Sequence, residues 1–194
     1  TGYMTDMIKL KKISNKFKIP VVEDACQSIL GSINNKNAGT WGELGAFSLH
    51  PLKNINVWSD GGIITTNSLK FYKLLKLLRN HGLINRDKAV LCGYNSRLDT
   101  FQAVVGNWIL PKARIIAKKR ILNAKYFDKK FSQIKQISIP PRMLNYKIVY
   151  HLYIVFAQNR DALLKYCLKN GIEAKIHYPT PIYLQKSLKF LKYK

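Results

Sequence analysis

The amino-acid sequence predicts an α/β fold in which helices cover a mostly parallel β-sheet, followed by part of a smaller α+β domain. The first observation is that helical and extended apolar patterns alternate between residues 6 and 79, as is typical of layered α/β domains. The second is a long helical pattern that begins near Leu98 and leads into a region of short strand patterns. With 47% hydrophobic residues among 194, the chain can bury a core of this kind.

The elements before residue 80 follow from the spacing of their apolar residues. Met7, Leu10 and Phe17 recur at helical spacing, whereas the run from Ile19 to Val22 favours a buried strand. Residues 46–49 and 62–66 favour two further strands. The expected order is a helix over residues 6–17, strands over 19–22, 46–49 and 62–66, and a helix over 69–79.

The second half of the chain predicts one long helix and then a small domain. The helical pattern runs from Leu98 towards Phe127, and Pro111 within it lacks a backbone donor, which predicts a kink or a break. Strands are expected over residues 134–141 and 149–157, with an amphipathic helix over 161–169. We expect residues 1–125 to be a partial large domain and residues 126–194 a partial small C-terminal domain.

Two residues, Asp24 and Lys53, carry the chemical signal. Asp24 follows an apolar run, so it is expected at the carboxyl end of a strand, where ligands bind in α/β sheets. Lys53 follows an apolar segment, a setting that disfavours the ammonium and frees the amine to attack a carbonyl. Pyridoxal phosphate needs a lysine for a Schiff base and a carboxylate beside its pyridine nitrogen. The pair therefore indicates a pyridoxal phosphate site, whereas either residue alone is more simply a solvated side chain.

Seven ordered blocks of sequence extend this signal along the whole chain. They are Glu23–Gln27, Gly39–Gly42, Phe47–Asn54, Asp60–Thr65, Arg79–Gly82, Gly93–Leu98 with Gln102 and Ala103, and His177–Pro179. Together they resemble the DegT/DnrJ/EryC1/StrS family of pyridoxal-phosphate sugar aminotransferases. The resemblance implies a fold-type-I transferase with pyridoxal 5'-phosphate as its cofactor.

The resemblance also implies a role for each matched position around the cofactor. Lys53 would form the Schiff base and move a proton between substrate and cofactor carbons, and Asp24 would pair with the pyridinium nitrogen. Gln27 would bond near the ring hydroxyl, and Ser48 would donate to the phosphate. Asn95 would reach the phosphate of the neighbouring subunit. This last role implies a homodimer with shared active sites.

His50, His177 and Tyr178 are the residues that the resemblance implies on the substrate side. Structural alternatives stay open for several positions. Ser48 also fits an ordinary buried hydroxyl, and Asn95 fits a turn residue after Gly93.

The chain departs from the family pattern at one position of the site and at its ends. Cys26 stands where the family has alanine, and a thiol is apolar enough to pack under a cofactor ring. The sequence from Thr1 lacks the family's amino-terminal phosphate-binding turn and ring-stacking aromatic residue, and Lys194 precedes the family's last elements. We therefore expect residues 1–194 to be a fragment that is inactive in isolation.

The net charge of +23 is the observation that points to a different class of protein, because such a charge is typical of nucleic-acid binding. Only seven of the 33 basic residues are arginine, however, and the lysines are spread along the chain. Arginine is the residue favoured for recognition of phosphates and bases. We expect solvated helix faces and no nucleic-acid partner, with a basic nucleic-acid-binding module as the lesser alternative.

Cysteine usage and hydropathy indicate a cytoplasmic protein. Cys26, Cys92 and Cys167 have no metal-ligand spacing and form an odd number, so neither a disulfide framework nor a metal site is expected. No apolar run approaches the length of a membrane span, so no membrane partner is expected.

The function expected from these observations is transfer of an amino group from glutamate to a keto sugar carried on a nucleotide. The chemistry rests on Lys53 and Asp24, and the substrates rest on the resemblance. A second hypothesis within the same fold is a regulatory protein that binds pyridoxal phosphate through Lys53 but does not catalyse amino transfer.

Overall fold

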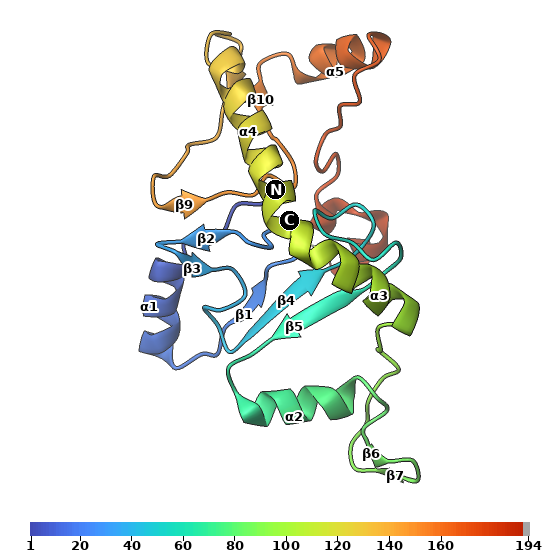
Figure 1. Ribbon diagram of the computed structural model, residues 1–194. Coiled ribbons are helices and arrows are strands. Elements are labelled where there is room, and N and C mark those ends of the chain that lie inside the picture. The colour runs from blue at the N-terminus through green and yellow to red at the C-terminus, as the bar shows by residue number, and fades with distance from the viewer. Residues whose placement is uncertain (192–194) are drawn as a thin grey trace. The chain divides into compact units, whose positions relative to one another are not determined.

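The computed structural model describes residues 1–191, which fall into two compact units (Figure 1). The first unit comprises residues 1–130 and 140–154, and the second comprises residues 131–139 and the chain from 155 onward. The two units are therefore interleaved along the sequence. The domain boundary expected near residue 125 stays a prediction.

The first unit is built on a three-stranded sheet in the order β1, β4, β5 (Figure 1). β1 (Val22–Asp24) pairs in parallel with β4 (Leu44–Ser48), and β4 pairs antiparallel with β5 (Gly62–Thr65). The first strand lies further along the chain than the expected residues 19–22. The reason is local, because the Ile19 N–H is bonded to the Ser14 carbonyl and Pro20 has no N–H to donate.

Two helices precede and follow these strands within one residue of their expected positions. α1 (Met7–Phe17) begins after Asp6, whose carboxylate accepts from the Lys9 N–H at 3.0 Å. α2 (Leu69–Leu78) begins after Ser68, whose hydroxyl accepts from the Phe71 N–H. Each cap satisfies a backbone donor that the first helical turn leaves without a partner.

The long helix expected from Leu98 is broken at Pro111, as predicted. α3 (Thr100–Ile109) starts with a capping box between Asp99 and Gln102. A short 3₁₀ turn, η1 (Leu110–Lys112), then leads into α4 (Ala113–Phe131). Because the proline ring cannot donate to the helical ladder, the chain tightens there before the helix resumes.

The main hydrophobic cluster of the first unit lies under the loop that carries Lys53. Leu49, Ile55, Val57 and Ala113 are all at most 6% exposed and pack together. Three of these residues belong to the loop between β4 and β5, and the fourth begins α4. The loop is therefore anchored in the core on both sides of Lys53.

Short strands complete the first unit, and the sequence did not predict them. β2 (Ser32–Ile33) pairs with β3 (Lys36–Asn37) and with β9 (Tyr146–Lys147), and β6 (Leu83–Asn85) pairs with β7 (Lys88–Ala89). Two-residue strands carry no periodicity, so only their pairing partners define them.

The expected strand over residues 149–157 is wrong for most of its length, because only its last two residues are extended in a ladder. Residues before them are held by side chains instead. Arg142 makes a bidentate pair with Asp128 at 2.9 and 2.7 Å, and the Tyr153 hydroxyl donates to the same carboxylate at 2.7 Å. Burial, together with this hydrogen bond, raises the pKa of Tyr153 to about 12. The cluster ties the segment to α4 without a strand.

The second unit holds the remaining elements. β8 (Ile137–Ser138) pairs antiparallel with β10 (Phe156–Ala157), which leads into α5 (Arg160–Lys169), and two 3₁₀ turns follow, η2 (Ile182–Leu184) and η3 (Lys186–Leu191). The strand expected over 134–141 is thus shorter than predicted, and the helix expected over 161–169 is confirmed. In residues 1–191 no helix has the length and apolar content to cross a membrane.

Candidate active site

Asp24 is the last residue of β1 and therefore lies at the carboxyl end of a strand, as the sequence predicted. In the parallel ladder it is paired with Ala46 of β4, and the Ala25 N–H bonds to the Ala46 carbonyl at 2.9 Å. Paired residues of a sheet point to the same face, and so do residues two apart along a strand. Asp24 of β1 and Ser48 of β4 therefore share one face of the sheet.

The Asp24 carboxylate is held as an anion by Cys26. Its Oδ1 accepts from the Cys26 N–H at 3.1 Å. Hydrogen bonds from the Cys26 side chain and backbone, aided by the charge of Lys53, lower the pKa of Asp24, and desolvation opposes them only in part because the residue is exposed. The same thiol lies 3.7 Å from the Ala46 carbonyl, and burial followed by the neighbouring Asp24 raises its own pKa. Cys26 is thus a neutral thiol beside a charged carboxylate.

Lys53 lies in the loop between β4 and β5, at the end of a turn in which its N–H bonds to the His50 carbonyl at 2.8 Å. Its side chain is half-buried. The Lys53 ammonium acts electrostatically on Asp24, on Cys26 and on the Thr1 amino group. Lys53 and Asp24 are 29 positions apart in the sequence but lie close enough at the strand ends for their charges to interact.

Ser48 and Gln27 follow from a strand end and a turn of the same unit. Ser48 ends β4, and its Oγ accepts from the His50 N–H at 3.3 Å. Gln27 lies in a turn closed by the Ser28 N–H on the Ala25 carbonyl, directly after Asp24 and Cys26. Both side chains are half-buried. Their expected contacts with the phosphate and the ring hydroxyl remain predictions.

His50 faces Asp60 from the start of the Lys53 loop. Its Nδ1 accepts from the Leu52 N–H at 3.1 Å, so in the neutral ring the proton is on Nε2, which lies 3.9 Å from the Asp60 carboxylate. Gln102 holds the other side of this loop by donating to the Asp60 carbonyl at 2.7 Å. His50 is therefore oriented beside Lys53, and its substrate contact stays a prediction.

Asn95 forms its hydrogen bonds with residues other than Asp24 and Lys53. Its amide oxygen accepts from Arg97 Nε at 3.0 Å, and its backbone bridges to Asn80. Asn95 is exposed, and across residues 1–191 no hydrogen bond joins it to Asp24, Ser48 or Lys53. An exposed position is compatible with the expected reach into another subunit, which remains a prediction.

His177 and Tyr178 belong to the second unit. Both are exposed, and their adjacent rings have centroids 3.8 Å apart. Lys53 belongs to the first unit, so these two residues are described separately from it. Their substrate role therefore remains a prediction.

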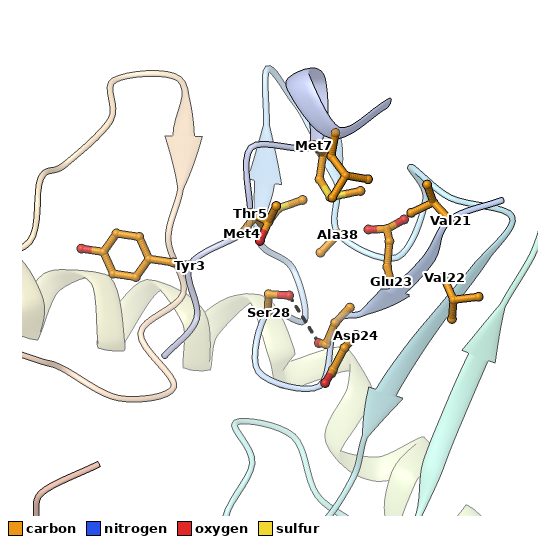
Figure 2. A pocket seen from close by; sticks show the side chains of 12 residues that line it. Tyr3, Met4, Thr5, Met7, Val21, Val22, Glu23, Asp24, Ser28 and Ala38 are labelled. Atoms are coloured by element: carbon orange, nitrogen blue, oxygen red, sulfur yellow. Dashed lines mark hydrogen bonds between the residues drawn. The ribbon is translucent and has the colours of Figure 1, made fainter. Parts of the chain in front are cut away.

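A cavity of about 220 Å³ borders Asp24 on the side of α1 (Figure 2). Its lining residues come mainly from the first ten positions, from Val21 and β1 and from the turn that follows, and Ala38 lines it from directly after β3. Neither Lys53 nor Ser48 lines it. The cavity therefore shares only the carboxylate with the candidate site and is not the space between the two reactive groups.

Sequence reasoning gave no role to Glu23, although it directly precedes Asp24. Glu23 is 7% exposed and accepts from the N–H groups of Gly39 and Gly42, each at 2.8 Å, and from that of Trp41. Gly39 has a positive φ of 75°, which glycine adopts at little cost. The available signal was a second carboxylate at the end of the apolar run, because such a group is buried only when it is bonded.

These features define a class. An α/β sheet with a carboxylate at one strand end, and a lysine acting on it from the loop of the adjacent strand, is the arrangement of fold-type-I pyridoxal-phosphate-binding transferases. More narrowly, the chain belongs to the DegT/DnrJ/EryC1/StrS aminotransferase family, whose model matches residues 1–194.

Individual relatives support the same assignment. The chain is 30% identical to the pleiotropic regulatory protein of Geobacillus stearothermophilus, over all of this chain and 52% of the relative. It is 31% identical to the UDP-N-acetyl-3-dehydro-alpha-D-glucosamine 3-aminotransferase of Acidithiobacillus ferrooxidans, over 95% of this chain and 50% of the relative. The crystal structure of a DegT DnrJ EryC1 StrS aminotransferase from Brucella abortus matches 97% of this chain and 50% of its own, with a TM-score of 0.92 at 28% identity. The chain spans about half the length of these proteins.

The family depends on pyridoxal phosphate, and the residues present fit that cofactor. The fit rests on the donor set of the site. Asp24 offers an anion suited to a pyridinium, Lys53 offers an amine suited to an aldehyde, and the charges of the two interact. In the described part of the chain no cluster of histidine, cysteine or acidic residues could hold a metal ion.

Proposed function

We propose that the protein is a pyridoxal-phosphate-dependent aminotransferase that moves an amino group from glutamate to a nucleotide-linked keto sugar. The observation that carries the proposal is that the charge of Lys53, in the loop after β4, acts on Asp24 at the end of the adjacent strand β1 in a member of this family. The substrate class is supported by relatives such as the Acidithiobacillus ferrooxidans enzyme, whose name specifies a UDP-linked sugar.

Each residue of the site contributes a distinct step. Pyridoxal phosphate, when bound, supplies an aldehyde for amine exchange and a ring that withdraws electrons. Lys53 would hold the cofactor through its Nζ and, when free, would carry a proton as general base and acid. The Asp24 carboxylate holds the ring nitrogen protonated. Ser48 and Gln27 bind the phosphate and the ring hydroxyl, and His50 contacts the substrate.

A second candidate function is regulation by a cofactor-binding protein that does not turn over. The relative from Geobacillus stearothermophilus named as a pleiotropic regulatory protein favours this reading. Lys53 alone does not separate the two functions, because a regulator that binds the aldehyde would need the same amine.

The half-reaction with glutamate separates an aminotransferase from a regulator. We expect the full-length, cofactor-loaded protein mixed with glutamate to convert its cofactor to the aminated form and to release one equivalent of 2-oxoglutarate. Absorbance spectra and assay of the keto acid measure the conversion, and D-glutamate serves as the control donor. A spectrum that glutamate leaves unchanged would favour regulation.

We further propose a homodimer in which Asn95 completes the partner's site. In that case a Lys53→Ala subunit and an Asn95→Ala subunit are each impaired alone. Mixed dimers of the two carry one site with both native residues, so we expect co-refolded mixtures to regain up to about a quarter of the parent activity, the share of intact sites in a random mixture. Activity that stays at the level of the separate variants would contradict shared sites.

We propose a cytoplasmic location and small-molecule partners only. Cys26, Cys92 and Cys167 are free thiols, which suits a reducing compartment. The net charge of +23 is spread over lysine-rich faces. A dedicated nucleic-acid-binding module would instead bind tightly, with an affinity that falls steeply as salt rises.

A further inference from the structure

The loop that carries Lys53 is fixed at its base by backbone hydrogen bonds. The Leu49 N–H bonds to the Gly61 carbonyl at 2.7 Å, and the Val57 N–H bonds to the Leu49 carbonyl at 3.1 Å. Leu49 and Val57 are also buried in the core. These contacts hold the two ends of the loop, whereas its outer part from His50 to Asn54 needs a further attachment to be held in place.

Asn54 supplies that attachment from the position directly after Lys53. Its Nδ2 donates to the Val149 carbonyl at 3.1 Å, across 95 positions of sequence. Val149 is fully buried, and its N–H reaches the Gly2 carbonyl at 3.4 Å. The next carbonyl along, that of Tyr150, accepts from Arg120 of α4 at 3.0 Å. Asn54 therefore ties the loop to a segment that is itself bonded on both sides.

The other end of the Asn54 amide is unusual. Its Oδ1 is buried and has no hydrogen-bond partner in the part of the chain that the structure describes. The amide cannot be reversed to satisfy it, because that would set the oxygen against the Val149 carbonyl. Burying an acceptor that has no partner is unfavourable. The bond to Val149 is therefore what holds this amide in place among the described residues.

We propose that Asn54 is a positioning residue for Lys53, which fixes the direction of the lysine side chain through its bond to Val149. The inference rests on the proposed function, because the position of the Lys53 amine matters only if that amine reacts with the cofactor. Reacting atoms must be held close to their productive geometry, and a lysine with four rotatable bonds gains most from a fixed backbone. The hydrogen bond from Asn54 fixes the residue next to Lys53 and so limits the positions that Nζ can reach.

The test measures capture of the cofactor by cofactor-free, full-length protein, independently of turnover. Pyridoxal phosphate is added, and at increasing times the Schiff base between lysine and cofactor is reduced with borohydride. Peptide mass spectrometry then identifies the modified lysine. The variants are Asn54→Leu, which removes the donor at similar size, and Asn54→Gln, which keeps a donor on a longer arm. Asn56→Leu is the matched control, because Asn56 lies in the same loop but its amide oxygen accepts from the nearby Trp58 N–H at 3.4 Å.

We expect capture at Lys53 to slow about tenfold in Asn54→Leu, to recover in part in Asn54→Gln, and to stay close to the parent rate in Asn56→Leu. Melting curves of the cofactor-free variants check that all are folded at the assay temperature. If Asn54→Leu does not fold, the nearly isosteric Asn54→Asp, which lacks the donor, replaces it under the same criterion.

Two results overturn the inference, and they differ from each other. Capture at Lys53 at the parent rate in Asn54→Leu rejects the positioning role and leaves the proposed function standing. Attachment of the cofactor to a different lysine in the parent protein rejects the proposed function and the positioning role together.

Discussion

Replacing Lys53 by alanine is expected to lower the rate of amino transfer by the full-length protein by about 10⁴-fold or more. The variant loses both the amine that binds the cofactor aldehyde and the group that carries the proton afterwards. The fold should survive, because Lys53 is half-buried and the loop is anchored by its neighbours Leu49, Ile55 and Val57. Steady-state assay with glutamate and a nucleotide keto sugar measures the loss, and circular dichroism checks the fold.

Two further variants separate the amine from its charge. Lys53→Arg keeps a positive charge beside Asp24 but offers no nucleophilic amine, so it should be nearly as inactive as Lys53→Ala. Lys70→Ala removes an exposed lysine of α2 and should retain parent activity. Comparable turnover by Lys53→Arg and the parent would show that charge alone is needed and would remove Lys53 from the chemistry.

The parts of the fold that the sequence predicted are those defined by local patterns. α1 and α2 have apolar residues at helical spacing and polar caps at Asp6 and Ser68, and both formed within one residue of expectation. The break at Pro111 follows from the missing N–H of one residue. Asp24 ends a strand as expected, although that strand begins where the apolar run stops.

The parts that the sequence did not predict depend on partners far away in the chain. β2 pairs on one side with residues near 147, far along the chain, and no periodicity within Ser32–Ile33 predicts this pairing. The segment before β10 reads as a strand in sequence, yet Arg142 and Tyr153 attach it to Asp128. Side-chain attachment replaces the ladder, and apolar alternation cannot distinguish the two.

The candidate site divides in the same way. Asp24 and Lys53 were found because a carboxylate and a lysine after apolar runs match the needs of one cofactor. Asn54 lies in the same motif, but its bond to Val149 spans 95 positions and leaves no trace in the local sequence. Glu23 could have been found from its place at the end of the apolar run, although the loop that it binds could not.

Replacing Asp24 by asparagine is expected to reduce kcat of the full-length protein by about 10²–10³-fold, the range typical for loss of one electrostatic contact to developing charge. The amide is nearly isosteric and can still accept from the Cys26 N–H, so cofactor binding should weaken rather than vanish. What is lost is the anion that holds the ring nitrogen protonated. Cofactor titration and single-turnover kinetics with glutamate measure the two effects separately.

The pH dependence gives an independent check on Asp24. Hydrogen bonds from Cys26, with help from the Lys53 charge, lower the pKa of this carboxyl. A depressed folded-state pKa means that the charged form, and the stability it contributes, is complete above the ordinary pKa of an aspartate and is lost only as pH falls through the lowered value. Cys26→Ala removes the thiol donor, so it should move the acid limb of kcat to higher pH while leaving the rate near neutral pH close to that of the parent. An acid limb that stays in place in Cys26→Ala, together with near-parent kcat in Asp24→Asn, would show that another group keeps the ring protonated.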